Sequence, residues 1–327
     1  PEKKIAENLN IKFIKIPLSG FRGKSFFSKL KAFLAFLLTG FYFLVKIWPF
    51  KTLNKKETPL IAFGGYVSLA AFFYFKGPVY LQEQNTIPGS VSRLLVSTKK
   101  VKKVFCGFKQ TQNYFKKISK EENRIILSGN PVSPNFHTLY KENKNKFLQN
   151  IEMKILILGG SQGSKSLNLI LPKALFNIEE LFVKHQCGKN NFDETEITYQ
   201  KYTNDKNKIE IIEYIDNIHE YYGWADIIIC RAGALTVSEV SASGSLGIFI
   251  PLPWAIDNHQ FFNAKQLKDL NAGFLIEENK NLEQDLIKIL NDIKKIEIDK
   301  LRIMKENAYK AYIKSPERKI YDEVAEK

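Results

Sequence analysis

The sequence predicts an α/β protein with two doubly wound domains that face each other across a cleft. Three observations support this fold class. Short apolar runs alternate with helical patterns, many runs end in glycine or a polar turn, and the alternation pauses near residue 134 before it resumes. The 327 residues suffice for two domains, since one domain usually has about 100–200 residues. Ligands of such sheets bind at the carboxyl ends of the strands, so we expect the functional site in the cleft.

The composition excludes several classes of protein. With 44% apolar and 25% charged residues, the chain is neither disordered nor collagen-like nor of low complexity. The three cysteines form no Cys-x-x-Cys pair, which excludes a disulfide framework and a cysteine-based zinc site. We therefore expect a protein of the reducing cytosol.

Basic residues are concentrated in the first half of the chain. The whole chain has a net charge of +15, whereas residues 1–150 contain 26 Lys and Arg, 7 Glu and no Asp, a net charge of +19. A lysine-rich surface that is simply well hydrated is one interpretation. The asymmetry also indicates a face that meets nucleic acid or an anionic membrane. Because no nucleic-acid-binding motif is present, we favour the membrane and expect no nucleic-acid partner.

The most apolar segment comprises residues 26–50. Its uncharged run, residues 32–45, would reach roughly 21 Å as a helix, short of the roughly 30 Å of a bilayer core, so it does not span a membrane. It is either a buried core helix or an interfacial helix anchored by Lys29, Lys31, Lys46 and Trp48. Before it, alternating apolar and basic residues predict a strand over 11–16.

The remaining elements predict two parallel sheets. Strands of the first sheet are expected at residues 58–63, 79–81, 104–106 and 124–127. A linker candidate, residues 130–134, is followed by the charged run 141–146. Strands of the second sheet are expected at residues 154–158, 181–185, 209–213, 227–230 and 247–250. Helical patterns follow these runs, as parallel strands with crossover helices require.

The turn after residues 154–158 has the character of a phosphate site. Two glycines, Gly159 and Gly160, end the strand, and a helix with free N–H groups is expected to begin at about Ser164. The spacing fits neither the full Gly-x-Gly-x-x-Gly pattern nor a P-loop. Glycines at a strand-to-helix turn with a purely structural role remain the alternative.

Two further helix starts carry polar side chains towards the expected cleft. Thr236 and Glu239 have the spacing of a capping box, although a Glu in this position can instead accept hydrogen bonds from the vicinal hydroxyls of a sugar. Residues 257–264 follow a Pro-Leu-Pro bend and bunch polar amides at a helix start. Such side chains either cap the helix or bind the hydroxyls or phosphate of a ligand.

Several motifs together resemble one family. The segments LSGFRGK (18–24), FGGYVS (63–68), QEQN (82–85), GNPV (129–132), LGGSQGSKSLN (158–168), HQCGK (185–189), CRAGALTVSE (230–239) and DNHQFFNA (257–264) occur in the order of the MurG family. These are the N-acetylglucosaminyltransferases of glycosyltransferase family 28, which act in peptidoglycan synthesis. The resemblance covers essentially the whole chain.

The resemblance implies a GT-B arrangement of two Rossmann-like domains. Residues 1–134 are expected to bind the acceptor and the membrane, and residues 135–305 to bind the UDP-sugar donor. Residues 306–327 are expected to form a helix that packs back on the first domain.

The same resemblance implies the residues of the donor site. Ser161 contacts a phosphate, Ile215 presents its backbone to the uracil, and Glu239 holds the ribose hydroxyls. The remaining donor-site residues implied are Asn85, Ala234, Leu235, Thr236, Val237, Ser238, Gln260 and Asn263.

On the acceptor side the resemblance implies a second glycine turn near the lipid pyrophosphate, formed by Gly64, Gly65 and Tyr66. Glu83 is the carboxylate that matches the family on this side, and we predict it as the general base. No Asp-x-Asp sequence occurs, and we expect neither a metal nor a cofactor.

The chain departs from the family in three respects. The family's first strand, histidine-containing glycine turn and helix have no counterpart before Ile11, so we expect this chain to lack that unit and its histidine. Gln82 stands where the family has His, and Ser133 stands where it has Arg. We expect these two substitutions to alter contacts with the ligands rather than abolish them.

The implied activity is inverting transfer of N-acetylglucosamine from UDP-N-acetylglucosamine to the 4-hydroxyl of undecaprenyl-pyrophosphoryl-N-acetylmuramoyl-pentapeptide (lipid I). The product, lipid II, serves cell wall biogenesis and hence cell shape and division. The implied location is peripheral, at the cytoplasmic face of the inner membrane, where other cell-wall and division proteins are further partners. Two alternatives stay open: a glycosyltransferase acting on diacylglycerol, and a non-catalytic UDP-sugar-binding scaffold.

Overall fold

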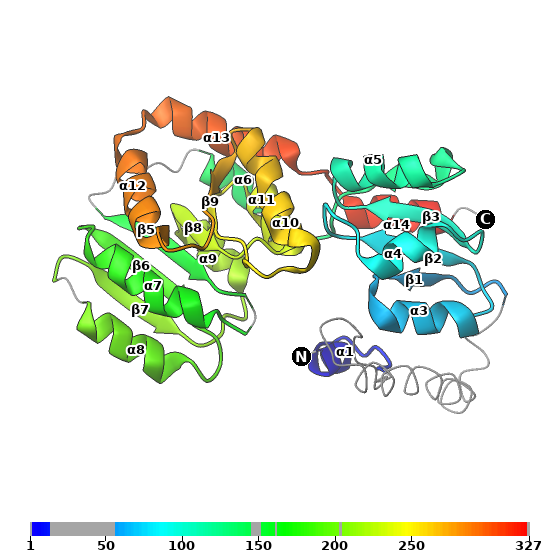
Figure 1. The fold of residues 1–327 in the computed structure, drawn as a ribbon, viewed down its shortest axis with the longest axis horizontal. Coiled ribbons are helices and arrows are strands. Elements are labelled where there is room, and N and C mark those ends of the chain that lie inside the picture. The colour runs from blue at the N-terminus through cyan, green and yellow to red at the C-terminus, as the bar shows by residue number, and fades with distance from the viewer. Residues whose placement is uncertain (1, 14–55, 145–151, 161, 203–204, 326–327) are drawn as a thin grey trace.

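The structure, a computed structural model, describes residues 2–13, 56–144, 152–160, 162–202 and 205–325. They form two α/β domains that lie side by side (Figure 1). A parallel sheet forms the centre of each domain, with helices on its faces. The predicted fold class is therefore confirmed.

The first sheet has four parallel strands in the order β1-β2-β3-β4. The strands are β1 (Leu60–Ala62), β2 (Val79–Glu83), β3 (Val101–Cys106) and β4 (Ile125–Leu127). The connecting helices are α3 (Gly65–Tyr74), α4 (Ser90–Val96) and α5 (Lys109–Ile118), with a short 3-10 turn, η2 (Glu122–Arg124), before β4. Apolar residues of these helices and of the strands form one core cluster, which includes Phe72, Leu95 and Phe115.

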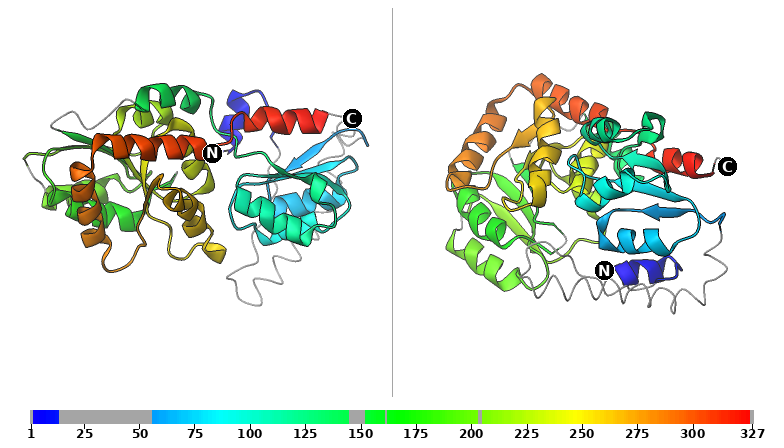
Figure 2. Two further views of the ribbon diagram at one scale, coloured as in Figure 1. Left: turned by 90° about the horizontal axis from the view of Figure 1, so that it is seen from above. Right: turned by 45° about the vertical axis from the view of Figure 1, so that its right-hand side comes forward.

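The last helix, α14 (Pro316–Ala325), covers the other face of this sheet (Figure 2). Its Ile320 packs against Tyr80 and Phe105, and its Glu323 pairs with Lys103. The alternation of β2 explains this arrangement, since Val79 and Leu81 face α3 to α5 while Tyr80 faces α14. Helix α14 thus packs on the first sheet, and the exact domain limits at residues 134 and 305 stay predictions.

The second sheet has six parallel strands in the order β10-β9-β8-β5-β6-β7. The strands are β5 (Met153–Leu158), β6 (Leu181–Gln186), β7 (Lys208–Ile212), β8 (Ile227–Cys230), β9 (Leu246–Phe249) and β10 (Gly273–Leu275). The helices are α6 (Asn135–Asn143), α7 (Lys165–Phe176), α8 (Phe192–Lys201), α9 (Ile218–Trp224), α10 (Ala234–Ser243), α11 (His259–Asp269), α12 (Leu282–Lys295) and α13 (Ile298–Ala311), with the short η3 (Ile256–Asn258) before α11.

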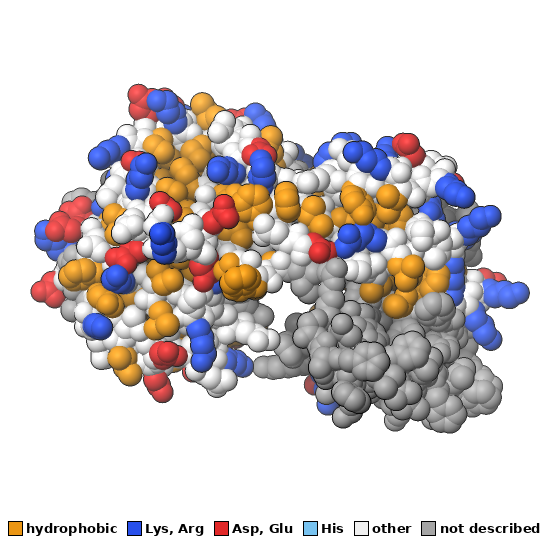
Figure 3. All heavy atoms as spheres, viewed as in Figure 1, with side chains coloured by type: hydrophobic (Ala, Val, Ile, Leu, Met, Phe, Trp, Pro, Cys, Tyr) orange, Lys and Arg blue, Asp and Glu red, His pale blue; other side chains and the backbone are white. Residues whose placement is uncertain are grey.

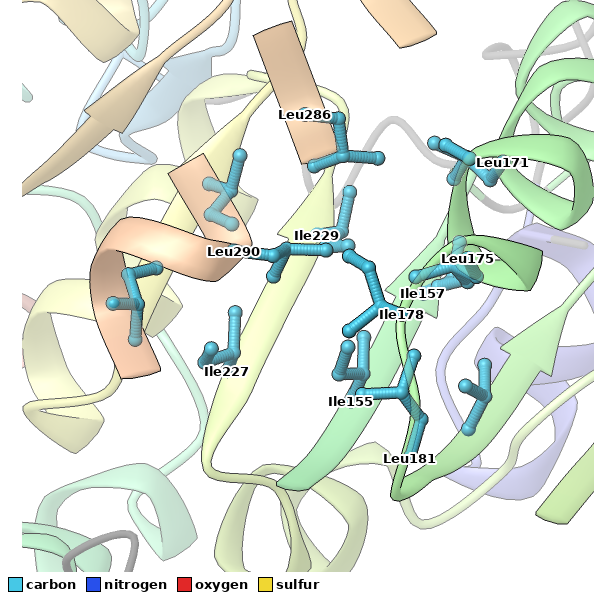
Figure 4. Close-up of a cluster of buried hydrophobic side chains, with 14 of the residues drawn as sticks. Ile155, Ile157, Leu171, Leu175, Ile178, Leu181, Ile227, Ile229, Leu286 and Leu290 are labelled. Carbon is cyan, nitrogen blue, oxygen red and sulfur yellow. The ribbon is translucent and has the colours of Figure 1, made fainter. Parts of the chain in front are cut away.

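The central strands of this sheet are apolar on both faces because helices cover both. Ile155 and Ile157 point into a cluster with Leu171 of α7 and Leu286 of α12, as Figure 4 shows. Leu156 points to the opposite face and packs in a cluster with residues of α6, α9, α10, α11 and α13. Continuous apolar runs are what a buried parallel sheet requires.

The strand prediction from sequence was correct for nine segments and wrong for one. Strands β1 to β9 lie within three residues of the predicted ranges, and the three-residue β10 was not predicted. The predicted strand 11–16 is wrong where it is described, because residues 11–13 have no regular structure and follow helix α1 (Glu2–Asn8). Ile11 and Phe13 are 58% and 41% exposed there, so alternation did not bring them onto a buried sheet face.

The apolar segment 26–50 lies outside the described residues, as does the rest of the range 14–55. Within the part of the chain that is described, no helix is both long and apolar enough to cross a bilayer.

Candidate functional site

The carboxyl ends of the two sheets meet at the boundary between the domains, and hydrogen bonds cross it there. Asn263 of α11 is fully buried; its Oδ1 accepts a hydrogen bond from the Thr86 backbone N–H at 2.9 Å, and its Nδ2 donates to Asn85 Oδ1 at 3.2 Å. Asn130 Nδ2 donates to Ser238 Oγ at 3.1 Å. The loops after β2 and β4 are therefore fixed against α10 and α11.

A more exposed ion pair joins the same two domains. Arg93 of α4 contacts Asp257 at 2.7 Å, and each side chain is about one-third exposed. Asp257 and Asn258 both have left-handed backbone conformations, with φ of 55° and 52°. Such conformations are uncommon outside glycine and often occur at functional loops.

In the glycine turn after β5, some glycines have the structural role and another fits the phosphate site that the sequence analysis considered. A Cβ on Gly159 would lie 2.5 Å from Ser164 N, and one on Gly163 would lie 1.8 Å from Cys187 O. These two glycines are required by the fold. Gly160 has a φ of +94° and no atom within 4 Å of its Cβ position, so the space beside its Cα is open, while its carbonyl accepts a hydrogen bond from Gly163 N at 2.9 Å. Ser161, the predicted phosphate contact, lies outside the described residues.

Two helix N-termini point to this edge without side-chain caps. Helix α7 begins after Ser164 and α10 after Gly233, and neither capping residue makes a side-chain hydrogen bond to the helix. The first-turn N–H groups of both helices are therefore available to an anion.

Arg231 is a buried charged side chain at this edge that sequence reasoning did not single out. It is 7% exposed, and its guanidinium donates to Ser164 Oγ at 2.7 Å and to Ser166 Oγ at 2.8 Å. Glu278 pairs with it in the interior. A fixed ion pair thus lies behind the start of α7, with its guanidinium directed to Ser164 and Ser166. The sequence signal was an Arg between a buried strand and a glycine turn.

Glu239 lies in the second turn of α10 and the capping-box interpretation is wrong. Helix α10 begins at Ala234 with Gly233 as its N-cap, so Thr236 is already inside the helix. Tyr222 Oη donates a hydrogen bond to Glu239 Oε2 at 3.1 Å. Among the described residues Oε1 has no hydrogen-bond partner. Burial raises the pKa of Glu239, and the hydrogen bond from Tyr222 opposes part of that rise.

Two matches with the family cover most of the chain. Residues 1–106 match the glycosyltransferase family 28 N-terminal domain, and residues 154–324 match the glycosyltransferase family 28 C-terminal domain. This chain belongs to glycosyltransferase family 28.

Individual relatives agree with the family. The chain is 37% identical over 325 residues to the UDP-N-acetylglucosamine--N-acetylmuramyl-(pentapeptide) pyrophosphoryl-undecaprenol N-acetylglucosamine transferase of Francisella philomiragia, covering 97% of this chain and 84% of that protein. Its namesake from Francisella tularensis subsp. holarctica is 36% identical over 328 residues, with the same coverage. The crystal structure of Acinetobacter baumannii MurG superposes with a TM-score of 0.74 at 29% identity, covering 100% of this chain and 88% of that one. The predicted resemblance to the MurG family and its GT-B arrangement is confirmed.

A more distant neighbour supports the fold alone. The UDP-N-acetylglucosamine 2-epimerase of Neisseria meningitidis, solved with UDP-N-acetylglucosamine bound, has a TM-score of 0.64 at 13% identity, covering 100% of this chain and 88% of that one.

The family 28 donor residues predicted from sequence gather around α10 and α11. Ala234 and Ser238 are buried at the domain boundary, whereas Leu235 is 48% exposed. Val237 is 1% exposed and packs in the core, so its side chain supports α10 and does not line the cleft. Gln260 Oε1 accepts a hydrogen bond from Leu252 N at 3.0 Å and so holds the loop before α11.

Ile215 follows β7, and its side chain is buried in the core. Its backbone is the part that the family resemblance assigns to the uracil. The contacts of all these donor-site residues with a ligand stay predictions.

On the acceptor side, Gly64 and Gly65 form the turn into α3 with φ of +76° and +74°. Tyr66 lies in α3, and its side chain is outside the described residues. Glu83 ends β2, where Oε1 accepts a hydrogen bond from Asn85 N and Oε2 accepts one from Gly89 N, both at 3.1 Å. This geometry gives Glu83 a clear role in holding the loop 84–89, and its role as general base stays a prediction.

Gln82, one of the two positions expected to depart from the family, lies near this boundary. Gln82 Nε2 donates to Asn130 Oδ1 at 3.0 Å, while its buried Oε1 has no partner among the described residues. Ser133 is exposed in the loop before α6. Among the described residues no group of three or more His, Cys, Asp or Glu side chains could hold a metal ion.

Proposed function

We propose that this chain transfers N-acetylglucosamine from UDP-N-acetylglucosamine to the 4-hydroxyl of lipid I, with inversion at the anomeric carbon and release of UDP. The family and the names of its relatives support this reaction. The observation that carries the proposal is the arrangement at the ends of β5 and β8. There two uncapped helix N-termini and the open space beside Gly160 lie at the same edge of the sheet as Glu239.

The donor binds to this edge through its charged and polar parts. The diphosphate accepts hydrogen bonds from the first-turn N–H groups of α7 and α10, and the Arg231 guanidinium holds Ser164 and Ser166 at the start of α7. The ribose hydroxyls donate to Glu239, whose Oε1 is free for them. Gln260 and Asn263 lie beside the sugar, and the uracil meets the backbone of Ile215.

The chemical step is a direct displacement. The acceptor oxygen attacks the anomeric carbon, the bond from that carbon to the diphosphate oxygen breaks, and UDP leaves with the electron pair. Helix N-termini stabilise the negative charge that develops on the leaving diphosphate. The proton of the acceptor hydroxyl passes to a base, for which Glu83 is our proposal.

A Glu83→Gln substitution tests this base. We expect turnover to fall by about 10²-fold or more, because general base catalysis typically contributes that much. Glu57→Gln is the control, since Glu57 is exposed and precedes β1 at the opposite edge of the sheet. Full turnover in the Glu83 variant removes the residue from the role of base.

The membrane is the proposed location of the acceptor domain. The net charge of +19 in residues 1–150 suits the anionic cytoplasmic face of the inner membrane, where each well-placed Lys or Arg contributes about 1 kcal/mol. Figure 3 shows basic side chains over both domains on one face. Binding to vesicles with phosphatidylglycerol, and loss of that binding at high salt, is the expected result; equal binding to neutral vesicles contradicts it.

One assay distinguishes the three candidate activities. Transfer of labelled N-acetylglucosamine is measured to a short-chain lipid I analogue and, separately, to diacylglycerol. We expect product with the first acceptor only. Product with diacylglycerol supports the lipid glycosyltransferase alternative, and UDP binding without turnover on either acceptor supports the scaffold.

A further inference from the structure

A buried polar network lies at the carboxyl end of β6, and the proposed reaction does not use it directly. Its centre is His185, which is fully buried in the second domain. His185 Nδ1 lies 3.0 Å from Tyr199 Oη, and His185 Nε2 lies 3.0 Å from Asn168 Oδ1. Both partners are also buried, at 6% and 3% exposure. His185 opens the HQCGK segment, to which the donor site gave no role.

The hydrogen bonds of Asn168 determine where the imidazole carries its proton. Asn168 Nδ2 donates to the Cys187 carbonyl at 2.9 Å, so the amide oxygen of Asn168 is the atom that faces the ring. An oxygen can only accept there, and His185 Nε2 must therefore be the protonated nitrogen. Nδ1 then accepts the Tyr199 hydroxyl. Burial lowers the pKa of His185 to about 3, so the ring is neutral.

The Cys187 carbonyl links this network to the glycine turn. Asn191 Nδ2 donates to the same carbonyl at 3.1 Å, which fixes it from a second side. The turn itself rests against it, since a Cβ on Gly163 would lie 1.8 Å from that oxygen. A Cβ on Gly188 would in turn lie 2.3 Å from Gln162 O. The two turns thus pack backbone against backbone, with no side chain between them to absorb a shift.

We propose that His185, as its Nε2–H tautomer, is the positioning residue for the diphosphate of a nucleoside-diphosphate ligand. It orients Asn168, which holds the Cys187 carbonyl, against which Gly163 and, through Gly163, the start of α7 are set. The inference rests on the proposed function, because only that function places a diphosphate at the glycine turn. A charged imidazole has no part in it.

Two amide substitutions that differ by one methylene in length test the proposal. In His185→Gln the side-chain amide reaches the position of Nε2 and still donates to Asn168, whereas in His185→Asn it reaches only the position of Nδ1. We expect the glutamine variant to bind UDP within about threefold of the unsubstituted chain by calorimetry. The asparagine variant is expected to bind about 10- to 100-fold more weakly, because the turn is displaced.

A control at the other end of the same strand separates positioning from stability. Asn207 Nδ2 donates to Ile178 O at 2.7 Å and its Oδ1 accepts from Leu181 N at 2.9 Å, next to the start of β6. Asn207→Ala is expected to lower the melting temperature while UDP affinity is retained. Equal UDP affinity of His185→Asn and Asn207→Ala contradicts the proposal. A chain that fails to bind UDP without any substitution contradicts the proposed function instead.

The tautomer of His185 can be measured directly on the unsubstituted chain. Long-range ¹⁵N–¹H spectra report which ring nitrogen of each of the four histidines carries the proton, and His185→Gln assigns the signal. We expect an Nε2–H pattern for His185 that does not change between about pH 5 and 8. An Nδ1–H pattern, or titration in that range, overturns the inference.

Discussion

At the scale of single residues, Glu239 combines two opposed properties. Its burial raises the pKa, so that holding the ionised carboxylate in the fold is unfavourable, yet ribose hydroxyls need that carboxylate as an acceptor. A carboxyl group with a raised folded pKa leaves the fold most stable below its unfolded pKa, and stability is lost as the pH rises through the raised value. A loss of folding stability of this kind is typical of a residue whose role is to bind a ligand.

Glu239→Gln is therefore expected to stabilise the chain and weaken its binding of UDP. At about pH 7 the melting temperature should exceed that of the unsubstituted chain, and at about pH 4 the difference should disappear. UDP affinity should fall about tenfold or more, since hydrogen bonds to a charged acceptor are lost. Unchanged UDP affinity in calorimetry would remove Glu239 from the donor site.

The glycine turn offers a second comparison at this scale. Gly163→Ala meets the Cys187 carbonyl at 1.8 Å, whereas Gly160→Ala meets nothing within 4 Å, although both residues have a positive φ. We expect Gly160→Ala to cost about 1–2 kcal/mol of unfolding free energy from backbone strain. Gly163→Ala should cost about 2 kcal/mol more, since a steric clash adds to that strain. Equal losses in urea denaturation would contradict the close packing of the two turns.

Residue spacing predicted where Thr236 and Glu239 lie more reliably than it predicted their structural roles. Residue spacing suggested that Thr236 and Glu239 form a capping box, because spacing cannot show that Gly233 already starts the helix. Arg231 and Tyr222 were missed as site residues, since their partners come from other strands and helices. The hydrogen bonds of both, to Ser164 and to Glu239, exist only once the sheet has formed.

At the scale of elements, the Glu83 carboxylate holds both ends of the loop 84–89, while Asn263 and Thr111 hold its middle. Glu83 accepts backbone N–H groups of Asn85 and Gly89, so Glu83→Gln places an amide N–H₂ opposite one of these donors. We expect the amides of this loop to exchange with solvent about tenfold faster or more, measured by mass spectrometry. Lost turnover with unchanged exchange would show that Glu83 acts on the proton alone.

Elements with a strong local pattern were predicted well even when short, as the three-residue β1 and β4 show, whereas an element without such a pattern was missed. Apolar runs such as Ile227–Cys230 are buried on both faces, and their type follows from composition. Strand β10 has three residues and depends on its pairing with β9, which leaves no local signal. Residues 11–13 had the alternating signal and form no strand, because a strand also needs a neighbour to accept and donate its hydrogen bonds.

At the scale of the whole molecule, Asn263 is the central contact between the domains. It bonds to Thr86 and Asn85, which lie 177 and 178 residues away in the chain. No sequence pattern could have paired these residues, although the family resemblance named two of the three. The family resemblance thus predicted that the two domains face each other, but it did not predict which residues form the contacts between them.

Asn263→Ala is expected to open the cleft. Loss of the amide leaves the Thr86 N–H and Asn85 Oδ1 unpaired, a cost of about 1–3 kcal/mol for a buried group, so kcat/KM should fall about tenfold or more. Small-angle scattering should show a larger radius of gyration. Lys265→Ala on the same helix is the control, since its ion pair with Asp269 is exposed and within α11. If the radius of gyration and kcat/KM are both unchanged, Asn263 is not the residue that holds the domains together.

The most direct measurement is a crystal structure of the chain with UDP bound. Our account expects the diphosphate at the start of α7 and α10, the ribose within hydrogen-bond distance of Glu239 Oε1, and the uracil beside the backbone of Ile215. Uridine bound away from residues 233–239 would contradict it.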